Sequence, residues 1–492
     1  MITSVVPYFQ VHQPFRLRRY TYFDIGVNAR WFDDAENERL VRRVAERCYV
    51  PMNALILDLI DRTEGRFRCA FSVSGTALDQ MEAWAPEALE GFVRLSKTGA
   101  VEFLAETSHH SLAFLTDEAE LRAQIQAQAD RVERLFGRRP TTFRNTELVI
   151  DERIARTAED LGFTALLGEG ADHLLGWRSP GHVYGVVGCD RIRLLLRTYR
   201  FSDDIAFRYS NRSWPGWPLT PEKFAASIHA LPATEEVVGL FMDYETFGEH
   251  QWKETGILDF MSAMPAAVLA DERFDFQTPA EAVATRASVG DLAIPHPVSW
   301  ADAERDLTAW LGNPMQRSAN LAPYGLLPSL RRASRDDLTA AWRRLSTSDH
   351  LYYMCTKWFS DGDVHKHFSP YATPHDAFIA FMNVLDDLER RISAADVTVA
   401  GTAAARALPA IPGPASPERS VSGAAAGPKK RSRRRSAAGL TGGTLSPTAE
   451  TVPMAEMAGS IGASGSGDPM GVPPPRTRRG ARARSRKVPR SG

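Results

Sequence analysis

The stretch "GLFMDYETFGEH", residues 239 to 250, runs an apolar segment straight into a group of ionisable residues. Its apolar part has the length and composition of a buried β-strand. Asp243 and Glu245 follow at the point where that strand should end. In a parallel β/α barrel the carboxyl ends of the strands converge on one rim, and reactive side chains gather there. The stretch therefore predicts both a fold class and a place for chemistry.

The chain before residue 299 repeats this pattern. Short apolar runs, which we expect to be strands, alternate with longer stretches of helical periodicity such as 117–137 and 151–163. The expected strands are residues 5–11, 68–73, 101–106, 141–147, 164–169, 193–199 and 237–243. An alternation of about seven strands with helices predicts an α/β fold, a barrel-like parallel sheet over residues 1–298.

From about residue 299 the strand signal fades and helical patterns take over, at 300–312, 334–346 and 373–393. We expect residues 299–396 to form a helical subdomain packed on the barrel. Residues 397–492 are rich in Ala, Gly, Ser and Pro, a composition that buries too little apolar surface to order, so we predict a disordered tail.

The net charge of -1 hides an asymmetry along the chain. From Gly401 onward there are 16 Lys and Arg against 4 Asp and Glu, so the tail carries +12 and the remainder -13. Two basic clusters, at 429–435 and 476–487, favour either tethering to nucleic acid or an acidic surface, or simply a solvated tail. An acidic body repels phosphates, so any attraction to polyanions has to come from the tail.

Composition also bounds the cellular location. The four cysteines are far apart and form no CxxC pair, which fits a reducing cytoplasm better than a disulfide framework or a zinc ribbon. No segment approaches 18 uninterrupted apolar residues, and the N-terminus lacks the pattern of a secretion signal. We therefore expect a cytoplasmic protein without a membrane partner; the sequence does not indicate an oligomeric state.

Two carboxylates, Glu147 and Asp243, each end a strand-like run, and paired carboxylates are the minimal equipment for cleaving a glycosidic bond. Arg144 would favour an ionised Glu147, which suits a nucleophile. The charge of Glu245 would raise the proton affinity of Asp243, which suits an acid. A structural role for either carboxylate, as a cap or ion-pair partner, stays open at this point.

Other polar and aromatic residues fall near the same rim. Adjacent side chains on an extended segment point in opposite directions, so only one of His109 and His110 should face the rim, and we expect His110 to do so. Further rim candidates are His12, Gln13 and Asp79 at strand ends, and Trp252, Trp358 and Phe359 as rings that either stack on sugars or belong to the core. The Asp/His-rich segment 361–367 matches no standard metal loop, so we expect a polar cleft loop and no metal.

Five segments resemble, in order, the sequence regions of glycoside hydrolase family 57, and most closely its α-amylase-type members. They are "YFQVHQPFR" (8–16), "FSVSGTALDQ" (71–80), "FRNTELVI" (143–150), "LFMDYETFGEH" (240–250) and "YYMCTKWFSDGDVHKHFSPY" (352–371). The resemblance covers most of residues 1–392. It implies a (β/α)7 barrel, an incomplete relative of the eight-stranded TIM barrel, followed by a helical region that completes the cleft.

The resemblance also implies a retaining reaction on α-1,4-glucans without metal or cofactor. The nucleophile falls on Glu147 and the acid/base on Asp243. Substrate contacts fall on His12, Gln13, Glu245 and Asp361, and on Asp79 where many members carry the longer Glu. Glucanotransfer or glucan branching would use the same residues, with a sugar hydroxyl in place of water. A catalytically silent glycan-binding protein is the alternative from another class, although it would not need both Glu147 and Asp243.

Overall fold

The computed structural model describes residues 2–357 and 369–407, with side chains as far as Asp396. All of these residues belong to one compact unit, Met1–Pro412. Trp358, Phe359, Asp361 and the basic clusters of the tail lie outside the described residues. Among the helices that are described, none is both long and apolar enough to cross a membrane.

The predicted parallel barrel is confirmed. Seven strands run in the order β3-β2-β1-β8-β7-β5-β4, and every pair along this order is parallel. They are β1 (Thr3–Val11), β2 (Cys69–Val73), β3 (Val101–Phe103), β4 (Thr142–Phe143), β5 (Ala165–Glu169), β7 (Arg193–Arg197) and β8 (Val237–Asp243). A parallel bridge between Ala105 and Phe143 joins the two ends of this order, so the strands close on themselves.

Three short strands, which form two pairings, were not expected from the sequence. β9 (Phe274–Phe276) pairs with the start of β1, and β6 (Gly185–Val186) pairs with β10 (Asp291–Leu292) in a separate small sheet. Segments of two or three residues carry too little periodicity to be recognised in a sequence.

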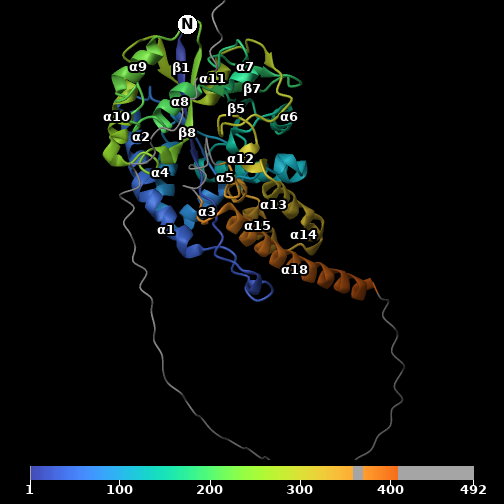
Figure 1. The fold of residues 1–492 in the computed structure, drawn as a ribbon. Helices are drawn as coiled ribbons and strands as arrows, with labels where there is room; N and C mark the ends of the chain where they lie inside the picture. Colours follow the sequence, from blue (N-terminus) through green and yellow to red (C-terminus); the bar gives the residue numbers. More distant parts are fainter. Residues whose placement is uncertain (1, 358–368, 408–492) are drawn as a thin grey trace, which may run out of the picture. The chain divides into compact units, whose positions relative to one another are not determined.

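Helices surround the strands (Figure 1). They are α1 (Asp34–Val44), α2 (Val50–Arg62), α3 (Gly75–Trp84), α4 (Pro86–Ser96), α5 (Glu118–Phe136), α6 (Glu152–Asp160), α7 (Asp172–Leu175), α8 (Tyr199–Ala206), α9 (Pro221–His229), α10 (Ile257–Val268) and α11 (Pro279–Ala284). The two helices expected at 117–137 and 151–163 begin where Asp117 and Asp151 accept a hydrogen bond from the backbone of the first turn. Gly137, with φ of 80°, ends α5 in the left-handed conformation that glycine adopts most easily.

The strands are buried on both faces, which explains their continuous apolar runs. Along β1, Val5 and Phe9 belong to a core beneath the helices, while Val6 and Tyr8 belong to a smaller core inside the barrel. Gly239 of β8 lies where a Cβ atom would come within 2.3 Å of the Leu196 carbonyl oxygen on β7. The neighbouring backbone therefore requires glycine at this position.

The inward face of β1 changes from apolar to polar toward its carboxyl end. Tyr8 and Ser72 hydroxyls both donate to the Gln10 side-chain oxygen at 2.8 Å, and the Gln10 amide donates to Glu106 at 3.4 Å. His12 follows on the same side of the chain, two residues further on. The barrel interior thus leads from a hydrophobic base to a polar layer directly below the strand ends.

The helical region after the barrel comprises α12 (Thr308–Leu311), α13 (Pro314–Gly325), α14 (Leu327–Ala333), α15 (Asp336–Leu345), α16 (Ser348–Tyr352) and α18 (Pro374–Ala407). The helix expected at 300–312 is reduced to α12, because residues 299–305 form an irregular segment with positive φ at Asp302 and Arg305. α18 continues past residue 396, where we expected order to end. Its last stretch is rich in alanine, the strongest helix former.

Candidate active site

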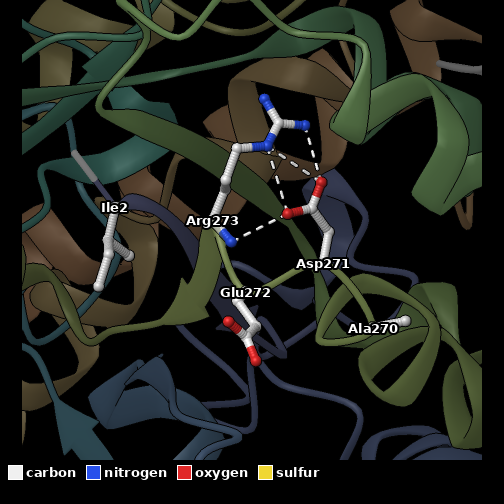
Figure 2. A pocket seen from close by; sticks show the side chains of 5 residues that line it. All are labelled: Ile2, Ala270, Asp271, Glu272 and Arg273. Carbon is white, nitrogen blue, oxygen red and sulfur yellow. Dashed lines mark hydrogen bonds and ion pairs between the residues drawn. The ribbon is translucent and has the colours of Figure 1, made fainter.

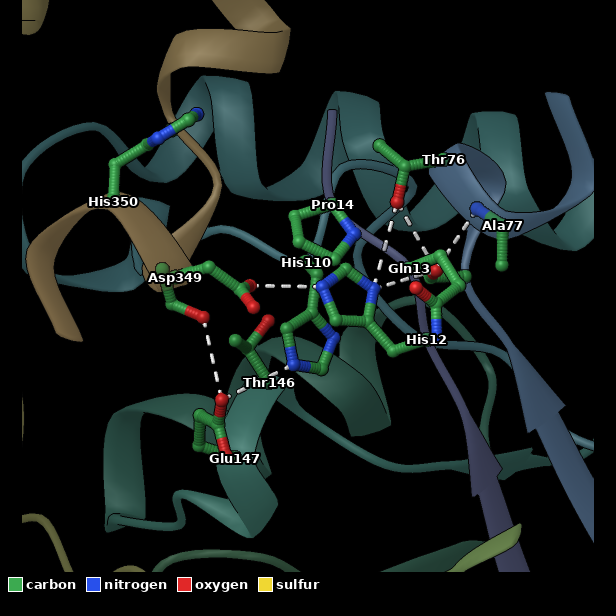
Figure 3. A network of polar contacts seen from close by, with 12 residues as sticks. His12, Gln13, Pro14, Thr76, Ala77, His110, Thr146, Glu147, Asp349 and His350 are labelled. Atoms are coloured by element: carbon green, nitrogen blue, oxygen red, sulfur yellow. Dashed lines mark hydrogen bonds and ion pairs between the residues drawn. The ribbon is translucent and has the colours of Figure 1, made fainter. Parts of the chain in front are cut away.

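Side chains from the carboxyl ends of several strands meet at one rim of the barrel. Glu106 follows β3, Glu147 follows β4, Asp243 ends β8 and His12 follows β1. Figure 3 shows His12, His110, Glu147 and Asp349 converging from different parts of the chain. The structure therefore brings together His12, His110, Glu147 and Asp243 of the predicted site residues, as their contacts and mutual charge effects record.

Glu147 lies in a one-turn 3-10 helix, η4 (Thr146–Leu148), and its backbone has φ of 55°. Its carboxylate receives three hydrogen bonds from the described residues. The Trp300 indole Nε1 donates to Oε2 at 3.0 Å, while His110 Nε2 and the Ser348 hydroxyl lie 3.3 Å and 3.4 Å from Oε1. The Glu147 side chain is still 20% exposed, so solvent reaches it. Donors arranged in this way favour the ionised carboxylate.

His110 links Glu147 to a second acid beneath it. Its Nδ1 lies 3.0 Å from Glu106 Oε2, and both side chains are almost fully buried. Burial alone would lower the pKa of His110, but the hydrogen bonds to Glu106 and Glu147 raise it to about 9. His110 is therefore an imidazolium at neutral pH, with a carboxylate on each side.

The hydrogen bond and charge of His110 lower the pKa of Glu147. Burial works to raise the pKa of Glu147, but the hydrogen bond and charge of His110, followed by the charge of Arg144, bring it below its ordinary value. The Arg144 side chain is fully buried and lies 3.9 Å from Glu106. Its guanidinium group has no hydrogen-bond partner among the described residues. Its predicted influence on Glu147 is therefore exerted through charge alone.

The pKa of Asp243 is shifted in the opposite direction from that of Glu147. Burial, and then the charge of Glu147, raise the pKa of Asp243 to about 6. The residue is half-buried, and its carboxyl group has no hydrogen bond or ion pair to any described residue. The raising charge is that of Glu147 and not, as expected, that of Glu245. Two carboxyls that interact electrostatically and differ in pKa in this way can divide into a base and an acid.

Of the two neighbouring acids, Glu245 has a more strongly raised pKa than Asp243. It is buried, accepts a hydrogen bond from the Tyr49 hydroxyl, and accepts another from the His12 backbone N–H at 3.4 Å. Burial, and then the charge of Asp243, raise the pKa of Glu245 to about 8. It fixes the segment that carries His12, directly after β1.

Two hydrogen bonds and one ring-stacking contact hold the His12 side chain in place. Its Nδ1 lies 2.7 Å from the Ser74 hydroxyl, its Nε2 lies 2.8 Å from Asp349 Oδ2, and its ring stacks on that of His110 at 3.9 Å between centroids. Burial, and then the charge of His110, lower the pKa of His12. Burial alone would raise the pKa of Asp349, but the charge of and hydrogen bond to His12 bring it far below its ordinary range. His12 and Asp349 are therefore an electrostatically coupled pair at the rim.

The remaining predicted contacts are placed as follows. Gln13 is buried behind His12, where its amide donates to the Tyr49 hydroxyl at 3.5 Å. Asp79 on α3 pairs with Arg131 at 2.6 Å and with Arg344 at 3.8 Å, and no contact joins it to the four site residues. Trp252 is 40% exposed and lines a separate hollow of about 530 Å³ beyond β8.

Sequence reasoning missed Glu106, Trp300, Ser348 and Asp349. Glu106 did carry a signal, because it ends the run 101–106 in the same way as Glu147 ends 141–147. The other three come from the segment after the barrel. α16 is brought to the rim by the Ser348 backbone N–H, which donates to the His110 carbonyl oxygen at 2.9 Å.

A larger hollow, of about 780 Å³, lies elsewhere on the barrel (Figure 2). It is lined by Ile2 and residues 270–273, which precede β1 and β9 and so mark the amino end of the sheet. Arg273 and Asp271 pair with each other there at 2.8 Å. In barrels of this kind the amino end serves stability and not chemistry.

No group of three or more His, Cys, Asp or Glu side chains among residues 2–357 and 369–396 is arranged to hold a metal ion. The segment 361–367, weighed above as a metal loop, is not among the described residues. The site is thus built from carboxyls, imidazoles and an indole.

Comparison with known proteins agrees with this arrangement. The family model described as glycosyl hydrolase family 57 matches residues 7–295, which include His12, Glu147 and Asp243. The chain belongs to glycosyl hydrolase family 57. A protein of Methanocaldococcus jannaschii with the name "Putative alpha-amylase" is 40% identical over 397 residues, covering 77% of this chain and 83% of that protein.

Two solved structures share the fold at low sequence identity. A branching enzyme of Pyrococcus horikoshii superposes with a TM-score of 0.56 at 14% identity, over 82% of this chain and 95% of that one. An alpha-amylase of Thermotoga maritima gives a TM-score of 0.50 at 13% identity, over 81% and 97% of the two chains. The fold of this chain is therefore shared with a protein described as a branching enzyme and with one described as an alpha-amylase.

Proposed function

We propose that the protein is a retaining α-glucan hydrolase in which Glu147 is the nucleophile and Asp243 the acid/base. The observation that carries this proposal is the divergence of the two pKa values: the hydrogen bond and charge of His110 lower the pKa of Glu147, while the pKa of Asp243 is raised to about 6 and its carboxyl group has no hydrogen bond or ion pair to any described residue. Near pH 5 the first is a carboxylate and the second retains its proton. That is the division of labour a retaining glycosidase requires.

The reaction follows from these states. Asp243 gives its proton to the glycosidic oxygen while Glu147 attacks the anomeric carbon, so the C–O bond breaks and a glycosyl ester forms on Glu147. Asp243, now a carboxylate, takes a proton from water, and the resulting hydroxide opens the ester with the original anomeric configuration restored. His110, Trp300 and Ser348 keep the leaving carboxylate oriented and stabilise its charge.

The substrate assignment to α-1,4-glucans rests on family 57 and on the relative whose name is an alpha-amylase. The expected sugar contacts are those predicted from the sequence: His12, Gln13, Asp79, His110, Glu245, Trp252, Trp358 and Asp361. We place the enzyme in the cytoplasm, as the sequence predicts, and all four cysteines carry free thiols. Tethering through the basic tail stays a prediction of the sequence.

Incubation with maltoheptaose tests the proposal. We expect shorter products only; longer products would mean glucan transfer or branching, and no turnover would favour a binding protein. Glu147→Gln and Asp243→Asn should each reduce kcat by roughly a thousandfold or more while the thermal unfolding midpoint stays close to that of the wild type. Glu133→Gln serves as the control, because Glu133 is half exposed on α5 and, among the described residues, its carboxylate pairs with Arg139 alone. Full activity in Glu147→Gln would refute the proposal.

A further inference from the structure

The segment that follows the barrel, residues 299–305, contacts the backbone and the side chain of Glu147. The Ser299 hydroxyl donates to the Glu147 carbonyl oxygen at 2.9 Å, and the Trp300 indole donates to its carboxylate at 3.0 Å. Glu147 and Leu148 both have positive φ, 55° and 52°, which residues with a Cβ atom adopt only when their surroundings impose it. The contacts from Ser299 and Trp300 are part of those surroundings.

Trp300 is itself fixed by contacts to its ring and to its backbone. The guanidinium groups of Arg144 and Arg197 lie 4.9 Å and 5.9 Å from the centre of its ring. Arg305 donates to the Trp300 carbonyl oxygen. A tryptophan held in this way cannot turn its N–H away from Glu147 without disturbing buried charges.

The buried charges next to Trp300 form a network of their own. Glu169 and Asp203 each accept from Arg197, and Arg305 lies 3.5 Å from Glu169 and 3.7 Å from Asp203. Glu169 and Arg197 belong to the ends of β5 and β7, so the network ties the segment after the barrel to the barrel wall. The position of the indole is therefore set by the rim itself.

We propose that Trp300 is a positioning residue that orients the nucleophile and keeps it ionised, a role that rests on the function proposed above. An indole N–H can only donate a hydrogen bond, and a carboxylate oxygen is a stronger acceptor than an oxygen of the neutral acid, so the indole stabilises the ionised form of Glu147 more than the protonated form. It also holds Oε2 while Oε1 faces His110 and Ser348. The carboxylate thus has one orientation before substrate arrives.

Trp300→Phe removes the N–H and keeps an aromatic ring next to the guanidinium groups of Arg144 and Arg197. We expect kcat on maltoheptaose to fall by roughly tenfold to a hundredfold with KM within about twofold, the size of a lost hydrogen bond to a charged group. Because the ionised form of Glu147 loses a donor, its pKa rises, and the acid limb of the kcat/KM profile moves to higher pH.

Trp310→Phe is the matched control. Trp310 is buried in the helical region and its Nε1 has no hydrogen-bond partner among the described residues, so this variant makes the same chemical change away from the rim. It should leave both kcat and the pH profile unchanged. A purely structural role for Trp300 would lower the unfolding midpoint in Trp300→Phe without moving the acid limb, and this result would overturn the proposal.

The test is separable from that of the proposed function. If the wild type is active and Glu147→Gln is not, the nucleophile assignment stands, and a Trp300→Phe enzyme with wild-type kcat and pH profile refutes only the positioning role. Should Trp300→Phe fail to fold, Ser299→Ala carries the test, since it removes one hydroxyl from the Glu147 backbone and leaves the ring in place. We expect a smaller loss of kcat in the same direction; unchanged kcat would contradict the proposal.

Discussion

Replacing His110 with glutamine removes the positive charge that lies between Glu106 and Glu147. Glutamine is similar in length and can still donate a hydrogen bond, so the change is mainly one of charge. His110 Nε2 lies 3.3 Å from Glu147 Oε1, and its Nδ1 lies 3.0 Å from Glu106 Oε2. The variant therefore measures how much the charge of His110 lowers the pKa of Glu147.

The geometry gives the size of the effect. Two unit charges about 3.3 Å apart at an effective dielectric constant of about 20 interact by about 5 kcal/mol, an upper bound for a side chain that is partly in contact with solvent. Opposite charges at such distances shift a carboxyl pKa by about 1 to 3 units. We expect the pKa of Glu147 to rise by an amount in this range. Buried Glu106 would keep Arg144, 3.9 Å away, as its cationic neighbour, so the loss of the His110 charge should cost at most about 3 to 5 kcal/mol of stability.

Both limbs of the pH profile should move in the same direction. The acid limb of kcat/KM reports Glu147, whose ionised form loses its main support, so this limb moves to higher pH. The alkaline limb reports Asp243, and since the charge of His110 lowers the pKa of Asp243, its removal moves that limb upward as well. Initial rates on maltoheptaose between about pH 3 and pH 9 measure both limbs.

His109→Gln is the control for this experiment. His109 contacts the Ser108 hydroxyl, and burial, followed by the charge of Arg343, lowers its pKa to about 3, so it carries no charge in the working range. Its replacement should leave the profile where it is. An unshifted acid limb in His110→Gln, with activity retained, would refute the account of how the nucleophile stays ionised.

Four further predictions follow from the same structure. Asp349→Asn should move the acid limb to lower pH, the opposite of His110→Gln, because the charge of Asp349 raises the pKa of Glu147; an upward shift would contradict this. The stability contributed by His110 is fully present below its ordinary pKa of about 6.5 and is lost as pH rises toward 9, so the unfolding midpoint of the wild type should fall over that interval and that of His110→Gln should not. Glu245, with its pKa raised to about 8, makes the wild type less stable as pH rises from 4.5 to 8, so Glu245→Gln should gain stability relative to the wild type between pH 5 and pH 8 in urea titrations. Gly239→Ala should cost about 1 to 3 kcal/mol of unfolding free energy, since the added methyl group meets the Leu196 carbonyl, and an unchanged urea midpoint would show that β7 and β8 can separate at no cost.

The long strands β1, β2 and β8 were predictable because their apolar runs are buried on both faces, whereas β3 and β4 are shorter than the runs 101–106 and 141–147 that we expected. The same reasoning located Glu147, Asp243, His12 and His110, since a residue that follows such a run in a parallel barrel must lie at the rim. The short strands β6, β9 and β10 carry no such signal. The end of α18 was set too early because an alanine-rich composition is common to helices and to unstructured tails.

The residues that approach from the helical region could not be found in this way. Trp300 lies in a stretch with helical periodicity, yet its backbone turns away from helix because the indole bonds Glu147 and the following residues join a buried charge network. Asp349 and Ser348 are at the rim because α16 docks on the His110 loop, a tertiary contact that no local pattern encodes. Sequence reasoning thus gives the strand ends, while the donors that tune them require the structure.

Identification of the residue that forms the covalent bond to sugar tests the central claim most directly. Incubation of Asp243→Asn with α-maltotriosyl fluoride should accumulate the intermediate, because fluoride leaves without a proton from Asp243 while hydrolysis of the ester still needs Asp243 as base. Digestion and mass spectrometry should then find the maltotriosyl group on the peptide that contains Glu147. A label on any other carboxylate, or steady release of fluoride without any labelled peptide, would contradict the assignment of Glu147 as nucleophile.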